Sequence, residues 1–234
     1  MLSSAVLAGV VGGLICLDKF QAMQVLVCRP IVCAPILGWC LGHVSAGLAT
    51  GVLFELLWLR RPPIGGFISP DSTVGAIIAA AVSSAVVQDV RMNVTAVVFI
   101  TFLLVFPVCY VGARVNANSR RYMGRIALRV EELQKEGREK KVMAYFLLAL
   151  ALGFSIAFLL IFTGTLYGLV LTPFLLSVLP DRIVRAAGFS YYVVPLIGAA
   201  DLLVGLHEKR QIIVFFLGLG GAICALVLFG FHGQ

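Results

Sequence analysis

Long apolar runs, separated by short polar breaks, dominate the sequence. Residues 94–115 and 142–162 are the clearest, since a bilayer-spanning helix needs roughly 20 apolar residues. Hydrophobic residues make up 61% of the chain and charged residues only 12%. A water-soluble globule of this composition would lack the polar surface to cover itself, whereas lipid is a suitable solvent for apolar side chains. We therefore predict an all-α integral membrane protein.

The number of these runs, and the prolines that interrupt them, predict a bundle of several membrane-crossing helices. We expect roughly seven to nine hydrophobic segments, judged by the length that each crossing requires. Pro35 and Pro173 lie inside apolar runs, so broken or re-entrant helices are expected among them. Three regions follow: an N-terminal membrane region over 1–113, a basic cytoplasmic amphipathic loop over 114–141, and a C-terminal membrane region over 142–234.

The basic region at 114–141 accounts for much of the net charge of +7 and holds nine of the eighteen Lys and Arg residues. Basic residues collect in the cytoplasmic loops of membrane proteins, so this distribution predicts a cytoplasmic location and argues against nucleic-acid binding. Tyr122, Ile126, Val130 and Leu133 recur at helical spacing, which predicts an amphipathic helix. Both a solvated connector and a docking surface fit this pattern.

Catalytic patterns are missing from the sequence. The three histidines, His43, His207 and His232, do not stand in a nucleophile–base pattern, and no phosphate loop, dinucleotide fingerprint or HExxH motif occurs. The six cysteines lie in apolar stretches without metal-ligand spacing. We therefore expect a chain that is not an enzyme by itself and that needs no cofactor and no metal.

Polar side chains within or beside the apolar runs are the best candidates for function, because an unpaired ion in hydrocarbon is costly. Four of the five charged candidates gather before residue 72, close to helix-interrupting prolines, and the fifth, Asp201, stands alone in a later apolar run. Carboxylates and amides can hydrogen-bond the hydroxyl groups of a sugar. Arg29 is expected to form a structural ion pair with Glu55 or Asp71. The predicted substrate-binding residues are Asp18, Gln21, Gln24, Glu55 and Asp71.

The order of these residues resembles a known family. Asp18 followed by Gln21, then Arg29-Pro30, a Gly-rich stretch ending in Glu55, and Gly65-Gly66 through Pro70-Asp71 are similar to the IIC membrane component of the mannose–fructose–sorbose family of sugar phosphotransferase system (PTS) permeases. The resemblance covers about a third of the chain. His43 stands where the family commonly has Asp, and the Arg60–Pro63 segment also departs from the pattern.

The resemblance implies a sugar-translocating subunit in a bacterial cytoplasmic (inner) membrane. Its implied partners are a IID membrane subunit and soluble IIA and IIB proteins, which carry the phosphoryl group on their own histidines; a homo-oligomer is also compatible with it. By motif, Asp18, Gln21, Glu55 and Asp71 become sugar-site residues, with Gln24 as an alternative to Gln21. The departures from the family pattern keep open an alternative, a non-transporting membrane scaffold or regulatory subunit.

Overall fold

The computed structural model describes residues 1–19, 21–22, 24–59, 69–89, 93–205 and 213, and every secondary-structure element in these ranges is an α-helix. The predicted all-α class is therefore confirmed for the described part of the chain. The seven helices, in chain order, are α1 (Leu2–Asp18), α2 (Pro30–Cys40), α3 (Val44–Trp58), α4 (Ser72–Asp89), α5 (Val94–Lys135), α6 (Glu139–Val178) and α7 (Asp181–Gly205).

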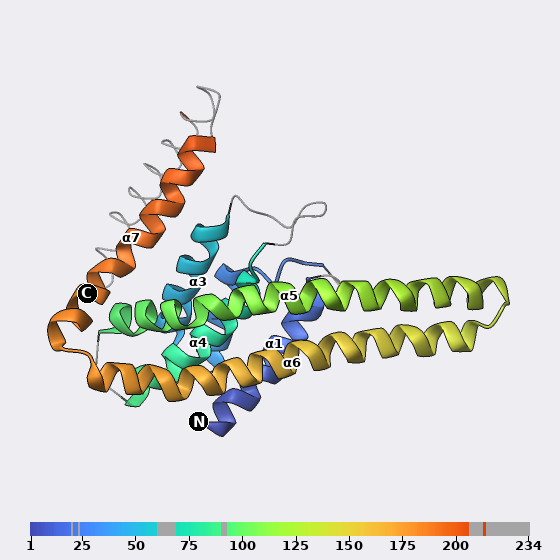
Figure 1. Ribbon diagram of the computed structural model, residues 1–234, viewed down its shortest axis with the longest axis horizontal. Coiled ribbons are helices and arrows are strands. Elements are labelled where there is room, and N and C mark those ends of the chain that lie inside the picture. Colours follow the sequence, from blue (N-terminus) through green and yellow to red (C-terminus); the bar gives the residue numbers. More distant parts are fainter. Residues whose placement is uncertain (20, 23, 60–68, 90–92, 206–212, 214–234) are drawn as a thin grey trace, which may run out of the picture.

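Helix α4 forms the centre of the bundle, and α1, α2, α3, α5 and α6 pack around it (Figure 1). Its residues 76–82 are completely buried, as expected of a helix that is apolar all round. Helix α6 approaches it closely because Gly164 and Gly168 face Ile78 and Val82. Small residues at such positions let helix backbones come together in membrane proteins.

Helices α2 and α3 form a tight antiparallel hairpin. Gly38 and Gly47 face each other across it, so that an added methyl group on either would meet backbone atoms. The turn contains Gly42 at φ +82°, a conformation that glycine adopts at low cost. With 11 and 15 residues, the two helices extend only about 17 and 23 Å, less than the roughly 30 Å of bilayer hydrocarbon.

Helices α5 and α6 form a much longer hairpin, which projects well beyond the bundle (Figure 1). They have 42 and 40 residues, or about 60 Å each, and they meet at a turn with Gly137 at φ +69°. The basic stretch that begins at residue 114 is therefore mostly helical and continuous with the apolar run before it. The apolar run at 142–162 and the apolar residues that follow it likewise form one helix, α6, and Pro173 does not end this helix.

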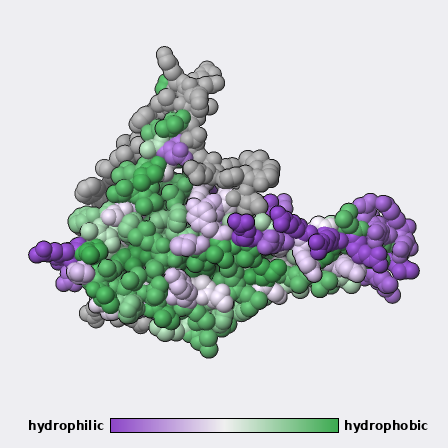
Figure 2. Space-filling model, in the orientation of Figure 1, coloured by the Kyte–Doolittle hydropathy of each residue, from purple (hydrophilic) through white to green (hydrophobic). Residues whose placement is uncertain are grey.

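Three described helices, α5, α6 and α7, are long and apolar enough to cross a membrane, and α1 to α4 are shorter apolar helices. Figure 2 shows a largely hydrophobic surface over the bundle and a hydrophilic end on the long hairpin. The apolar run at 212–231 falls almost entirely outside the described residues. The range of seven to nine hydrophobic segments therefore stays a prediction.

Candidate functional site

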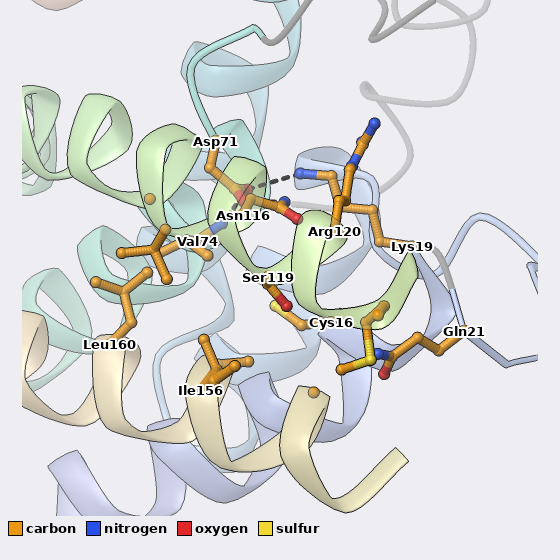
Figure 3. A pocket seen from close by; sticks show the side chains of 15 residues that line it. Cys16, Lys19, Gln21, Asp71, Val74, Asn116, Ser119, Arg120, Ile156 and Leu160 are labelled. Carbon is orange, nitrogen blue, oxygen red and sulfur yellow. Dashed lines mark hydrogen bonds and ion pairs between the residues drawn. The ribbon is translucent and has the colours of Figure 1, made fainter. Parts of the chain in front are cut away.

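A cavity of about 370 Å³ lies between the C-terminal end of α1, the N-terminal end of α4, and the middle of α5 and α6 (Figure 3). Its volume falls in the range of small-molecule sites, which combine apolar walls with a few convergent polar groups. Ile156 and Leu160 of α6 belong to the apolar wall. The polar and charged lining residues are Lys19, Gln21, Asp71, Asn116, Ser119 and Arg120.

Asp71 is a buried polar group of this cavity with several hydrogen-bond partners. Its side chain immediately precedes α4 and accepts a hydrogen bond from the backbone N–H of Val74 (3.2 Å), in the manner of an N-cap. Lys19 Nζ lies 2.8 Å from Asp71 Oδ1, and Asn116 Nδ2 donates to Oδ2 over 3.2 Å. The residue is only 5% exposed. Three separate parts of the chain thus converge on one buried carboxylate, with the charge compensation that a buried ion requires.

Gln21 reaches the opposite side of the cavity. Its Nε2 lies 3.5 Å from the backbone oxygen of Ala149 in α6. The side chain can lie there because residue 153 is glycine: a Cβ at Gly153 would collide with the Gln21 amide. Gln21 and Asp71 are therefore the two predicted binding residues that the structure brings to one cavity.

Asp18 does not line the cavity. Its oxygens accept hydrogen bonds from the backbone N–H groups of Val25 (2.7 Å) and Cys28 (3.2 Å). These bonds hold a loop in which Gln24 and Leu26 adopt positive φ values of 54° and 67°, a conformation that is unusual for residues other than glycine. Gln24 itself is exposed. Asp18 therefore stabilises a loop beside the cavity, and Gln24 points to its surface.

Glu55 is also outside the cavity lining and closes the open end of the α2–α3 hairpin. Its Oε1 lies 3.1 Å from Arg29 Nη1. Its Oε2 accepts the backbone N–H of Ile31 over 3.3 Å, one of the N–H groups at the start of α2 that has no partner within the helix. A carboxylate at this position also interacts favourably with the helix dipole. The arrangement ties the end of α3 to the beginning of α2.

Four polar lining residues, Lys19, Asn116, Ser119 and Arg120, are absent from the predicted site. Three of them come from the region interpreted as a loop. A signal for these three does exist in the sequence: Asn116 lies four residues after Gly112, the adjacent Ser119 and Arg120 lie three and four residues after Asn116, and Met123 lies four and three residues after them, so all share a helix face. This shared face can be recognised only if a single helix is assumed to continue past residue 114.

Long apolar helices packed around a cavity with apolar walls and a few polar groups define the class: a multi-pass membrane protein. Comparison with known families then gives a specific assignment. The family model described as the PTS system sorbose-specific IIC component matches residues 2–230. The chain belongs to this family.

Two relatives illustrate how far the similarity extends. A protein described as the putative N-acetylgalactosamine permease IIC component 2 of Escherichia coli (strain K12) is 33% identical over 88 residues, which are 37% of this chain and 65% of that protein. The PTS system sorbose-specific EIIC component of Klebsiella pneumoniae is 23% identical over 219 residues, 93% of this chain and 77% of that protein. The first match thus spans just under two thirds of its relative.

Solved structures share the fold. One described as a membrane protein superposes with a TM-score of 0.71 at 17% identity, covering 98% of this chain and 92% of the other. A cryo-EM structure of the mannose transporter ManYZ in complex with a microcin gives a TM-score of 0.58 at 16% identity, with the same coverage. At these identities the likeness concerns the fold.

Proposed function

We propose that this chain is the sugar-translocating IIC subunit of a mannose-family phosphotransferase permease. It binds a hexose or an amino sugar in the cavity at Asp71 and moves it across the membrane by alternating access. Import is coupled to phosphorylation of the sugar by separate IIA and IIB proteins, so the chain performs no phosphoryl transfer itself. The observation that carries this proposal is the buried carboxylate of Asp71, held by Lys19 and Asn116 at the edge of a cavity of small-molecule size.

The polar groups of the cavity suit a ligand that is rich in hydroxyl groups. A carboxylate offers about four acceptor positions, and the contacts from Lys19, Val74 and Asn116 use three of those of Asp71. The remaining one can accept a hydrogen bond from a sugar hydroxyl. Ser119 and Gln21 each offer both a donor and an acceptor. In this proposal Gln21 and Asp71 contact the sugar, whereas Asp18, Glu55 and Arg29 position the surrounding loop and hairpin.

The proposal also includes partners that phosphotransferase transport requires. A IID membrane subunit is expected to cover part of the apolar surface, and IIB is expected to reach the sugar from the cytoplasmic side. The hairpin of α5 and α6 marks that side by the positive-inside rule. The membrane is the bacterial inner membrane.

The scaffold alternative draws on departures from the family pattern, of which His43 is one. In the structure, His43 lies next to the turn of the α2–α3 hairpin, and its backbone oxygen accepts a hydrogen bond from Ser84 Oγ (3.5 Å). It does not line the cavity. This departure therefore leaves the proposed sugar site intact, and the transport reading is favoured.

Binding of radiolabelled sugars to the purified chain, reconstituted with its IID subunit, tests the function. The panel should include sorbose, mannose and N-acetylgalactosamine. We expect saturable binding of at least one of them, a loss of more than tenfold in affinity for Asp71→Ala, and no change for Gln24→Ala, an exposed control beside the same loop. Absence of binding by the unmodified complex, together with unimpaired association with IIB, would favour the scaffold. Equal binding by the Asp71→Ala variant would refute the site.

A further inference from the structure

The projecting part of the α5–α6 hairpin, residues 119–150, which we name the arm, has two chemically different faces. On α5, Arg121, Arg125 and Arg129 are exposed and lie within one arc of the helix at 100° per residue. On α6, an equally exposed arc is apolar and includes Met143, Phe146 and Leu147. Leu133 of α5 is only 2% exposed near the tip of the arm, and Ile126 and Val130 are half-buried along it. The two helices therefore pack through a shared interior, and the basic face of α5 and the apolar face of α6 both remain exposed.

The two helices also change from apolar to charged at different levels. Helix α5 becomes basic at Arg114, after about 30 Å of apolar helix. Gly112 in α5 lies beside Leu160 of α6, yet the charges of α6 are confined to residues 139–141. Between Leu160 and these charged residues, α6 is apolar over 18 residues, about 27 Å. Figure 2 shows the consequence, a hydrophilic upper side along the arm and hydrophobic patches beneath it.

An apolar stretch of this length cannot be contained in an upright crossing. Helix α6 has 40 residues and is about 60 Å long, twice the roughly 30 Å of hydrocarbon. A helix that is longer than the bilayer accommodates by tilting. Tilt brings the apolar side of the arm toward the membrane surface.

We infer that the arm rests obliquely on the cytoplasmic leaflet, with the exposed face of α6 at the boundary of headgroups and acyl chains and the arginines of α5 at the level of the lipid phosphates. Packed helices have axes 8–10 Å apart, and one headgroup layer is about 5–8 Å deep, so α5 lies at the outer edge of the headgroups, from which long arginine side chains can extend back to the phosphates. The inference rests on the proposed orientation of the chain, with the arm on the cytoplasmic side.

Anionic lipid is the occupant that the charge distribution favours. Residues 119–130 contain four arginines and no carboxylate, and this is the part of α5 within the arm that lies nearest the bundle. The glutamates of the arm follow later, and Glu131, Glu132 and Glu136 form ion pairs with Lys135, Arg129 and Arg138. Excess positive charge is thus concentrated where the arm leaves the membrane, beside an apolar face. Amphipathic helices that bind anionic membrane surfaces combine these two properties.

A matched pair of leucines allows a direct test. Leu147 on the apolar face of α6 and Leu128 on the basic face of α5 are 57% and 65% exposed. The photo-crosslinking residue p-benzoylphenylalanine would replace each in turn in the full chain, expressed in its host with the other subunits of its system. After illumination of intact membranes, we expect phospholipid adducts at position 147, at least fivefold more abundant by mass spectrometry than those at position 128.

Other results of the same experiment would overturn the inference. A larger protein band at position 147, containing either a second copy of the chain or another subunit, would show that protein covers the apolar face. Equal lipid labelling at positions 147 and 128 would show that the arm has no preferred side. Sugar binding measured on the same membranes separates the two proposals. If the arm does not rest on the membrane, sugar binding at Asp71 is still expected. If the sugar site is elsewhere, the lipid adducts at position 147 are still expected.

Discussion

Two carboxylates from the same sequence pattern, Asp71 and Glu55, pair with a basic residue in very different surroundings. Asp71 and Lys19 are both largely buried, and they face a cavity together with Asn116. Glu55 pairs with Arg29, whose side chain is 46% exposed, at the open end of a helix hairpin. The first pair stands where a ligand can reach it, and the second fastens two helices. An intramembrane charge therefore indicates a function only once its surroundings are known.

The largest effect is expected at the buried pair. Asp71→Asn removes the carboxylate charge that pairs with Lys19, and breaking a buried ion pair costs about 3–5 kcal/mol of stability. We expect a large fall in the thermal stability of the purified complex and loss of sugar binding. In the double variant Lys19→Met/Asp71→Leu, most of the stability should return while binding stays absent. Recovery of binding along with stability would mean that the carboxylate is structural only.

A smaller effect is expected on the other side of the cavity. Gly153→Ala places a methyl group where the Gln21 amide lies, so this side chain must leave its place against α6. We expect the sugar dissociation constant to rise about tenfold, equivalent to about 1.4 kcal/mol, with little change in melting temperature because Ala favours helix. Gly124→Ala, where an added methyl group meets no neighbouring atom, is the matched control. An unchanged dissociation constant for Gly153→Ala would remove Gln21 from the site.

Substitution in the exposed pair of Glu55 and Arg29 should have only a modest effect. Glu55→Gln removes the ion pair with Arg29 but keeps an oxygen that can accept from Ile31 N–H. Partly exposed ion pairs contribute about 0–1 kcal/mol, so we expect a small drop in melting temperature and sugar affinity within about threefold of the unmodified chain. A loss of binding as severe as that of Asp71→Asn would abolish the distinction between the two carboxylates.

The smallest effect is expected at Gln24. Its side chain is exposed in the loop that Asp18 holds, so Gln24→Ala should alter neither stability nor binding beyond measurement error. Sugar uptake into vesicles is the sensitive measurement here, because it also reports on movements of the loop during transport. Reduced uptake with normal binding would give Gln24 a role in translocation.

The sequence predicted the helical class because scarcity of charge is a property of the whole chain, independent of how its segments pack. It indicated a new region at residue 114, where the polarity of the sequence changes, whereas helix α5 continues through this residue. Arg, Ala, Leu and Glu, frequent in residues 114–135, are good helix formers, and packing against α6 extends the helix further. Asn116 and Ser119 were consequently placed in the basic cytoplasmic loop and not at the cavity.

Local patterns were also unable to separate Asp18 from Asp71. Both are acidic residues at the end or the beginning of an apolar helix. Their roles depend on which groups the fold turns toward them: the N–H groups of Val25 and Cys28 for Asp18, and the cavity with Lys19 and Asn116 for Asp71. These contacts depend on a positive-φ loop at Gln24 and Leu26 and on the position of α5, neither of which is encoded in residue spacing.

The continuity of helix α6 has a mechanical consequence. It meets α4 at Gly164, lines the cavity at Gly153, and ends in the arm at Glu139. Measured from Gly164 along the helix, Gly153 is about 17 Å away and Glu139 about 38 Å away. If α6 pivots at Gly164 as a stiff rod, the tip of the arm must travel more than twice as far as the cavity wall. A contact that limits the displacement of the arm tip therefore limits the displacement of the cavity wall in the same proportion.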